Sequence, residues 1–158
     1  MSNPLAGSRF YARLGNALTR PLWSVFPAPS GFGVLTVVGR RSGKLRRTSV
    51  RAIRAGDAVY VVAMMAERSE WLKNIRADPR VGIRLGAATL RGSAHEVVDA
   101  DAREQAAKVW VETTNANDYI DYVVYHWGIP SRRRIEHAHR EWFDNGVPVV
   151  IELDEGEH

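Results

Sequence analysis

The chain has 158 residues, of which 45% are hydrophobic and 25% are charged, so it fits one globular domain with a sizeable core and is neither disordered nor fibrous. It contains no cysteine, which excludes disulfides, thiolate metal sites and cysteine nucleophiles. A formal net charge of +4 and a pI near 9.8 favour an anionic partner: a phosphorylated cofactor, nucleic acid or an acidic membrane surface. Because no apolar run approaches ~18 residues and no secretory pattern begins the chain, we expect an intracellular, cytoplasmic protein.

The first part of the chain, residues 1–30, is expected to form an amphipathic helix followed by a proline-rich segment. Phe10, Leu14 and Leu18 recur every four residues among arginines, and Pro21 ends or kinks the helix. A basic helix of this kind, followed by an aromatic segment, can lie on a membrane surface. Packing of the helix on the domain is the commoner arrangement, so peripheral membrane contact is the alternative.

Short apolar runs separated by turn residues predict a strand-rich core over residues 31–99. The strands are expected at about 33–39, 46–54, 58–65, 80–86 and 88–98. Between the third and the fourth, Ser69 and Pro79 bracket a short helix. Short strands at close spacing are typical of an antiparallel barrel or sandwich.

The last part, residues 100–158, is expected to consist of helices and one closing strand. The helices are predicted at about 102–113, 117–126 and from 131 to near 145. The strand is predicted at 147–153, with Pro148 confined to its start or to a sheet edge. The three parts together are expected to form one domain, 1–158.

The turn between the first two strands is the strongest candidate site. Its glycines and serine, from Gly39 to Thr48, are surrounded by basic side chains, and such a turn offers N–H groups, a hydroxyl and cations to one anion. Seven of the 22 Lys and Arg residues fall within fifteen positions, a density that repels itself unless an anion is bound. They are Arg40, Arg41, Lys44, Arg46, Arg47, Arg51 and Arg54. The alternative is a solvated hairpin tip.

Strand alternation predicts which of these side chains reach a ligand. In a strand over 46–54, Arg46 and Thr48 share a face with Val50, and this face is expected to be interior. Arg46 and Thr48 then point toward a ligand at the open end of the barrel. Arg47 and Arg51 lie on the other face and are expected to be solvated.

Two motifs carry a resemblance to a known family. The turn, from Gly39 to Arg46, resembles the Gly-Arg-x-Ser-Gly-x-x-Arg signature of the deazaflavin-dependent nitroreductases. The segment from Trp71 to Pro79 is similar to the Trp-x-x-Asn-Leu-x-Ala-x-Pro helix that follows in these enzymes, at about the family's separation. The resemblance covers roughly residues 30 to 99. It implies an α+β, mainly β fold: a split β-barrel of about six antiparallel strands with an N-terminal helix and C-terminal helices.

The resemblance also implies a function, the transfer of a hydride from reduced coenzyme F420 to a small organic acceptor of the quinone, nitro or enone type. Residues from Ala63 to Glu67 stand where the family commonly has a small, glycine-containing segment against the cofactor. The residues expected to bind the cofactor are Arg40, Arg41, Ser42, Gly43, Lys44, Arg46, Thr48, Met64, Met65, Trp71 and Asn74. Proteins of this resemblance commonly form homodimers through exposed sheet edges.

Three tyrosines are the candidate catalytic residues. Tyr119, Tyr122 and Tyr125 are three apart in a predicted helix, so they are expected to share one face, where their hydroxyls can bind or protonate a substrate. The family places tyrosines in a comparable region beside the substrate. Packing of an aromatic stripe in the core is an equally open interpretation.

The same residues allow other ligands, and the chemistry of each ligand distinguishes them. FMN ends in one phosphate, which two cations would neutralise, whereas the phosphodiester and glutamate tail of F420 suit more of the basic turn. His137 and His139 are about 200° apart on a helix, so they cannot share an ion, and no metal site is expected. A nucleic-acid partner is not expected, because the basic turn has no interleaved aromatics. An FMN-binding split barrel and a non-catalytic cofactor-binding or lipid-binding relative remain the alternatives.

Overall fold

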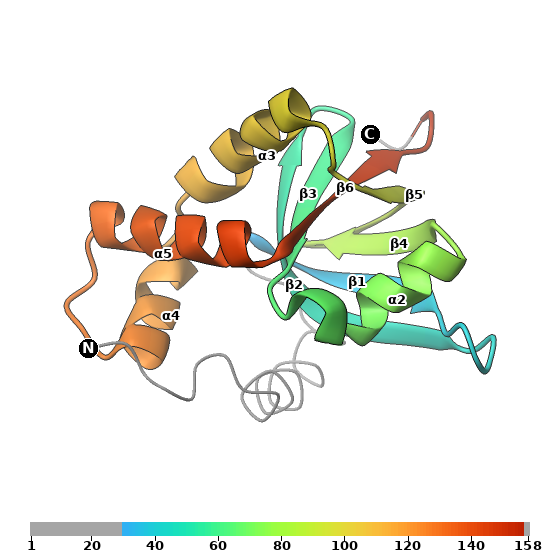
Figure 1. Ribbon diagram of the computed structural model, residues 1–158, viewed down its shortest axis with the longest axis horizontal. Helices are drawn as coiled ribbons and strands as arrows, with labels where there is room; N and C mark the ends of the chain where they lie inside the picture. Colours follow the sequence, from blue (N-terminus) through green and yellow to red (C-terminus); the bar gives the residue numbers. More distant parts are fainter. Residues whose placement is uncertain (1–29, 157–158) are drawn as a thin grey trace.

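A computed structural model describes residues 30–156 and shows an antiparallel barrel with helices packed outside it (Figure 1). The expected helix at residues 8–20 and the proline-rich segment after it lie outside the described residues. The described helices include none that is long and apolar enough to cross a membrane.

Six strands form the barrel, and each pairs antiparallel with two neighbours in the closed order β1-β2-β3-β6-β5-β4. The bounds are Phe32–Val38 for β1, Leu45–Ala55 for β2, Ala58–Ala63 for β3, Arg80–Leu85 for β4, Ala88–Glu96 for β5 and Val147–Leu153 for β6. The predicted six-stranded antiparallel barrel is therefore confirmed. Closure is partial along some strands: β2 pairs with β3 only at residues 52–55, and β5 pairs with β6 only at residues 92–96.

The helices agree with the predicted positions to within about two residues. They are α2 at Glu70–Ala77, α3 at Ala100–Glu112, α4 at Ala116–His126 and α5 at Arg132–Asn145. A short 3-10 helix, η1 at Ala66–Arg68, was not predicted. It begins where the third strand was expected to continue, because β3 ends at Ala63 and the chain turns at Met64 and Met65.

The barrel interior is the main core, and α2 contributes to it. Side chains from the strands, such as Leu35 and Val61, are fully buried there, and Leu72 and Ile75 of α2 pack among them. Helix α2 therefore lies against the end of the barrel where the chain leaves β1 for the basic turn (Figure 1).

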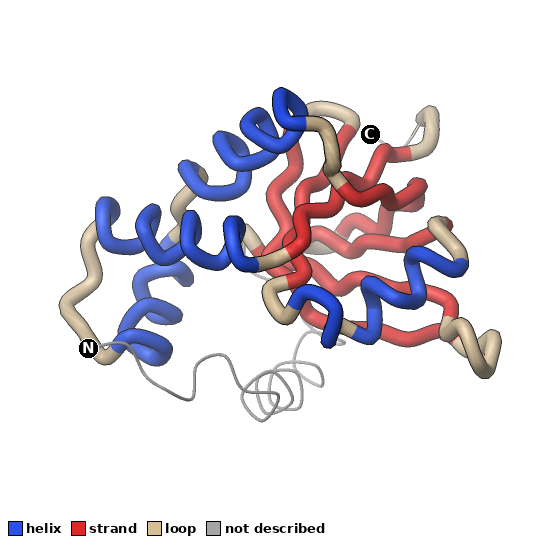
Figure 2. The backbone as a smooth tube through the Cα atoms, viewed as in Figure 1, coloured by secondary structure: helices blue, strands red, loops and turns tan. Residues whose placement is uncertain are grey.

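A second core lies outside the barrel, where α3 packs on β2 and β3, and α5 packs on α3 and β6. Figure 2 shows α3, α4 and α5 gathered on one side of the barrel, away from α2. Ile53 and Val62 of the strands pack here against Trp110 and Phe143 of the helices. Strand β2 is thus buried on both faces along Val50–Ile53, and the predicted alternation of a solvated and an interior face fails in this part of the strand.

Candidate functional site

The turn between β1 and β2 has a fixed backbone shape. The Gly39 amide donates to the Lys44 carbonyl and the Gly43 amide donates to the Gly39 carbonyl, both at 2.8 Å. Gly43 has a φ of +66°, a conformation that favours glycine, and a Cβ on Gly39 would lie 3.1 Å from the Lys44 carbonyl oxygen. The Ser42 hydroxyl accepts from the Lys44 amide at 3.3 Å. Both glycines are therefore needed to hold the basic side chains around one compact turn.

Four basic side chains of this turn are exposed and form no ion pair with any residue in the described part of the chain: Arg41, Lys44, Arg46 and Arg47. Arg46 pairs in register with Val37, and Thr48 with Leu35, two residues buried in the barrel interior. Because paired residues share a face of the sheet, Arg46 and Thr48 lie on the interior side of β2 toward its open end. This placement confirms the predicted interior face.

Arg40, in contrast, is bound to α2. Its backbone amide and its Nη1 both donate to Asn74 Oδ1, at 3.1 and 3.0 Å, and its Nη2 pairs with Glu70 at 2.9 Å. Asn74 is buried. Arg40 and Asn74, two of the residues predicted to bind the cofactor, therefore bind each other and hold the turn against α2. Within residues 30–156, the charge of the turn that no ion pair compensates comes from the other four cations.

The Met64–Met65 turn and Trp71 carry three of the side chains predicted to bind the cofactor. Met64 is 49% exposed, and Trp71 packs from the first turn of α2 against the interior core. Ala66, which follows Met65, has a φ of +45°, a conformation in which glycine is favoured. Residues 63–67 contain no glycine, although the family commonly has one in this segment. The backbone at Ala66 nevertheless has a conformation that suits glycine.

The candidate catalytic tyrosines belong to α4. Tyr119 is 38% exposed, and Tyr122 is half-buried, stacks on His126 with ring centroids 4.7 Å apart and borders a hollow of about 520 Å³. Arg133, Arg134 and His137 of α5 also line this hollow. Figure 1 places α4 and the β1–β2 turn toward opposite ends of the long axis, with the barrel between them. The structure does not bring the tyrosines and the basic turn into one pocket.

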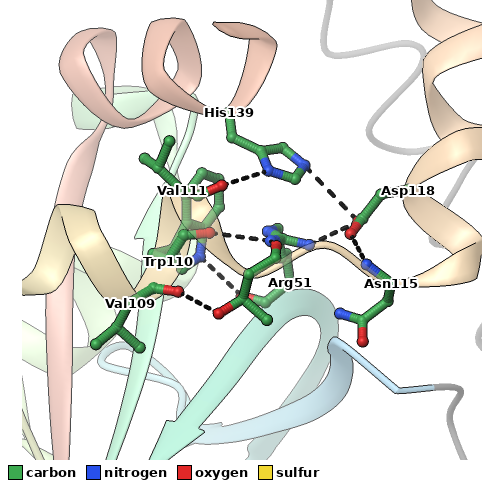
Figure 3. A network of polar contacts seen from close by, with 8 residues as sticks. Arg51, Val109, Trp110, Val111, Asn115, Asp118 and His139 are labelled. Carbon is green, nitrogen blue, oxygen red and sulfur yellow. Dashed lines mark hydrogen bonds and ion pairs between the residues drawn. The ribbon is translucent and has the colours of Figure 1, made fainter. Parts of the chain in front are cut away.

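A buried polar network between β2, α3, α4 and α5 was missed by sequence reasoning (Figure 3). The expectation that Arg51 is solvated is wrong: its side chain is 4% exposed, and Nη1 donates to Oδ1 of Asp118 at 2.6 Å. Its Nη2 donates to the carbonyls of Trp110, at 2.9 Å, and Thr113. The physical reason is that α3 covers the outer face of β2 at this point, so a charge on that face needs partners.

Burial sets the ionisation of the groups around this ion pair. Burial lowers the pKa of His139 to about 4, with the nearby Arg51 charge adding to the effect, so the imidazole is neutral at pH 7. Its Nδ1 lies 3.1 Å from the Val111 carbonyl, which fits donation from Nδ1, and its Nε2 lies 3.7 Å from Asp118 Oδ1. Burial, together with the Asp118 charge, raises the pKa of Asp121 to about 6.

A comparison with protein families identifies the chain. The model of the F420H(2)-dependent quinone reductase family matches residues 25–132, which include the basic turn, α2 and α4. This protein belongs to the F420H(2)-dependent quinone reductase family. It is therefore an oxidoreductase, and the resemblance inferred from the two motifs is confirmed.

Solved structures share the fold of this F420-dependent reductase. An F420-H2 dependent reductase, FDR-A, is similar with a TM-score of 0.54 and 20% identity over 79% of this chain and 95% of that chain. A domain-swapped dimer is similar with a TM-score of 0.57 and 20% identity over 87% and 94%. A heme binding protein from Mycobacterium smegmatis is similar with a TM-score of 0.55 and 14% identity over 98% and 53%. At these identities the likeness establishes the fold.

Proposed function

We propose that this reductase transfers a hydride from reduced F420 to a quinone-type acceptor, with the β1–β2 turn holding the anionic part of the cofactor and α4 facing the acceptor. The observation that carries the proposal is the group of four uncompensated cations on one rigid turn beside α2. The family name supports F420 as the cofactor and a quinone as the acceptor. Nitro and enone compounds are the competing acceptor classes.

The donor set of the turn fits the anionic half of F420. The single phosphate of FMN, of about −2, would be neutralised by two cations, whereas the turn offers more than two. The phosphodiester would be bound by Arg46, Thr48 and the Ser42 hydroxyl. The glutamate tail would extend past Gly43 to Arg41 and Lys44. Arg40 and Asn74 would keep the turn in place against α2.

The remaining residues of the proposed site would act on the ring end and on the acceptor. When bound, reduced F420 supplies the hydride, so the protein has to orient and desolvate the reactants. Met64, Met65 and Trp71 form a largely apolar surface that would exclude water from the ring. The Tyr122 hydroxyl would give a proton to an acceptor oxygen and take one back from solvent, and Tyr119 and Tyr125 belong to the same helix.

A side-by-side titration tests the proposal. Purified protein would be titrated with F420, FMN and a single-stranded oligonucleotide at one salt concentration, and F420 is expected to bind in the micromolar range and more tightly than the other two. Consumption of reduced F420 would then be followed with a quinone, a nitro compound and an enone. Oxidation that is fastest with the quinone supports the proposal, whereas no acceptor-dependent oxidation would contradict it.

The tyrosine assignment has its own test. Tyr122→Phe removes a hydroxyl and keeps the ring stacked on His126, so it is expected to lower turnover about tenfold or more while the Kd for F420 stays unchanged. Steady-state kinetics and a thermal melt distinguish a proton-donating Tyr122 from one that only packs in the fold. A clear fall in Tm with normal turnover would show that Tyr122 is a packing residue.

Two further proposals concern association. The domain-swapped dimer among the similar structures supports a homodimer, which light scattering on the purified chain would test. The basic residues expected in the helix at 8–20 support peripheral membrane contact. Sedimentation with anionic and with neutral vesicles tests that contact, which salt should weaken if it is electrostatic.

A further inference from the structure

We propose that Arg51 and Asp118 are positioning residues for the acceptor side of the site, because they fix the tyrosine helix α4 to β2, the strand that carries the proposed phosphate contacts. The inference rests on the function proposed above. Arg51 lies in the part of β2 covered by the helices, whereas Arg46 and Thr48 lie toward its open end. One strand therefore carries both the proposed cofactor contacts and the anchor of the proposed acceptor helix.

The guanidinium of Arg51 joins two helices to the barrel. It donates to a carboxylate of α4 at Asp118 and to the carbonyls of Trp110 and Thr113 at the C-terminal end of α3 (Figure 3). Carbonyls in the last turn of a helix have no partner within that helix, so Arg51 also supplies donors to the end of α3. The Trp110 ring stacks below the guanidinium, with its centroid 5.0 Å from Cζ. These contacts fix where α3 ends and α4 begins.

Asp118 has two roles at the start of α4. Its Oδ2 accepts from the backbone amide of Asn115 at 2.6 Å, as the acidic half of a capping box, while its Oδ1 accepts from Arg51. Consecutive residues of a helix point about 100° apart. Once Asp118 is held toward Arg51, the directions of Tyr119, the next residue, and of Tyr122, one turn later, are set as well.

Apolar packing holds α4 weakly, which makes this anchor important. The helix exposes an apolar stripe at the spacing i, i+3, i+4: Ile120 is 63% exposed, Val123 47% and Val124 51%, and Trp127, which follows the helix, is 70% exposed. These exposed side chains therefore contribute little to fixing the position of α4. A buried ion pair adds little net stability compared with an apolar contact, but it can select one arrangement of the elements that it joins. Here it joins the acceptor helix to the cofactor strand.

The test uses Asp118→Asn, which keeps the size of the side chain and one carbonyl acceptor, and Arg51→Lys, which keeps the charge. Arg54→Lys, on the same strand but exposed, is the matched control. We expect kcat for the quinone to fall roughly ten- to a hundredfold in the first two variants, as a misplaced catalytic group would cause. The Kd for F420 should change by less than about threefold, because the turn is untouched.

A double-mutant cycle separates positioning from general stability. In a Tyr122→Phe background, Asp118→Asn should lower kcat much less than in the native chain, because the hydroxyl that it misplaces is already absent. Hydrogen exchange gives a readout that does not depend on activity. The amides of α4 should exchange faster in Asp118→Asn, while those of the barrel strands keep their protection.

The outcomes distinguish this inference from the function on which it rests. If the native chain binds F420 and reduces a quinone, but folded Asp118→Asn keeps full turnover and native exchange in α4, the positioning role is wrong. Independent, multiplicative losses in the double-mutant cycle would also contradict it. If the native chain fails to bind F420, the proposed function itself fails. Faster exchange confined to α4 in Asp118→Asn would then still support the anchoring of the helix.

Discussion

The Nη1 atom of Arg51 lies 2.6 Å from Oδ1 of Asp118, a residue 67 positions further along the chain, and the two side chains are only 4% and 2% exposed. The pair links the barrel to helices that the sequence places in a separate region. At this burial solvent screens the two charges poorly, so the pair is held by its mutual contact and by the hydrogen bonds of each partner.

Breaking this pair should destabilise the fold strongly. Arg51→Ala leaves the buried Asp118 carboxylate without its cation, so we expect the free energy of unfolding to fall by about 3–5 kcal/mol. Urea denaturation measures it. Arg54→Ala, an exposed control on the same strand, should cost less than about 0.5 kcal/mol. The double variant Arg51→Met/Asp118→Ala should lose less than the sum of the single variants, and strictly additive losses would show that the pair is not coupled.

The reason Arg51 was missed lies in how far apart its partners are. Alternation along a strand assumes one solvated face, and it correctly placed Arg46 and Thr48 on the interior face, where they pair with Val37 and Leu35. It failed at Arg51 because α3, which covers the outer face of β2, begins 49 residues later. A local sign of this burial was present in the sequence. Val50 and Ala52 are apolar on one face of the strand, and Ile53 is apolar on the face that carries Arg51.

The strands and helices themselves were predictable, because their signals are local. Apolar runs and glycine turns set the barrel strands, and Asn115 with Asp118 forms a capping pattern at the start of α4. The end of β3 was not predictable from hydrophobicity, because Met64 and Met65 continue the apolar run although the chain turns there. The partners of Arg40 on α2 were also hidden, since they depend on how the turn packs.

Removing single cations from the β1–β2 turn should weaken cofactor binding. A charge-assisted contact contributes ~1.5–3 kcal/mol, so Lys44→Ala and Arg46→Ala should each raise the Kd for F420 by about ten- to a hundredfold. Fluorescence titration measures these constants. Arg54→Ala is the control, because Arg54 is exposed on the same strand, whereas Arg51 is buried and its loss would perturb the fold. Equal small effects in all three variants would show that the turn does not bind the phosphate.

The backbone at Ala66 offers a stabilising substitution. Its φ of +45° costs an L-residue about 1–2 kcal/mol, whereas glycine adopts it freely but loses more chain entropy on folding. Ala66→Gly is therefore expected to raise the free energy of unfolding by about 0.5–1 kcal/mol. Ala77→Gly should instead lower the free energy of unfolding, because glycine weakens the helix α2. If Ala66→Gly destabilised the protein as Ala77→Gly does, the backbone at 66 would not be strained.

Asp121 should make stability depend on pH. Its folded pKa of about 6 lies above the ordinary value of 3.8, so the folded state binds its proton more tightly. The stability that the folded state gains from binding this proton is fully present below pH 3.8 and is lost as pH rises through 6. Asp121→Asn should therefore stabilise the protein at pH 8 by about 1–2 kcal/mol, a figure reduced for partial exposure, and by little at pH 4. Thermal melts across this range measure the difference, and Asp144→Asn on the surface is the control. An Asp121→Asn advantage that does not change with pH would exclude ionisation as its cause.

The choice of cofactor is tested most directly by dissociation constants for F420, for F420 without its glutamates and for FMN, each at low and at high ionic strength. The four uncompensated cations of the turn predict that intact F420 binds most tightly, that removing the glutamates weakens binding, and that salt weakens the longest anion most. Tighter binding of FMN, or affinity that does not depend on the tail, would contradict the assignment of this turn to the phosphate and tail of F420.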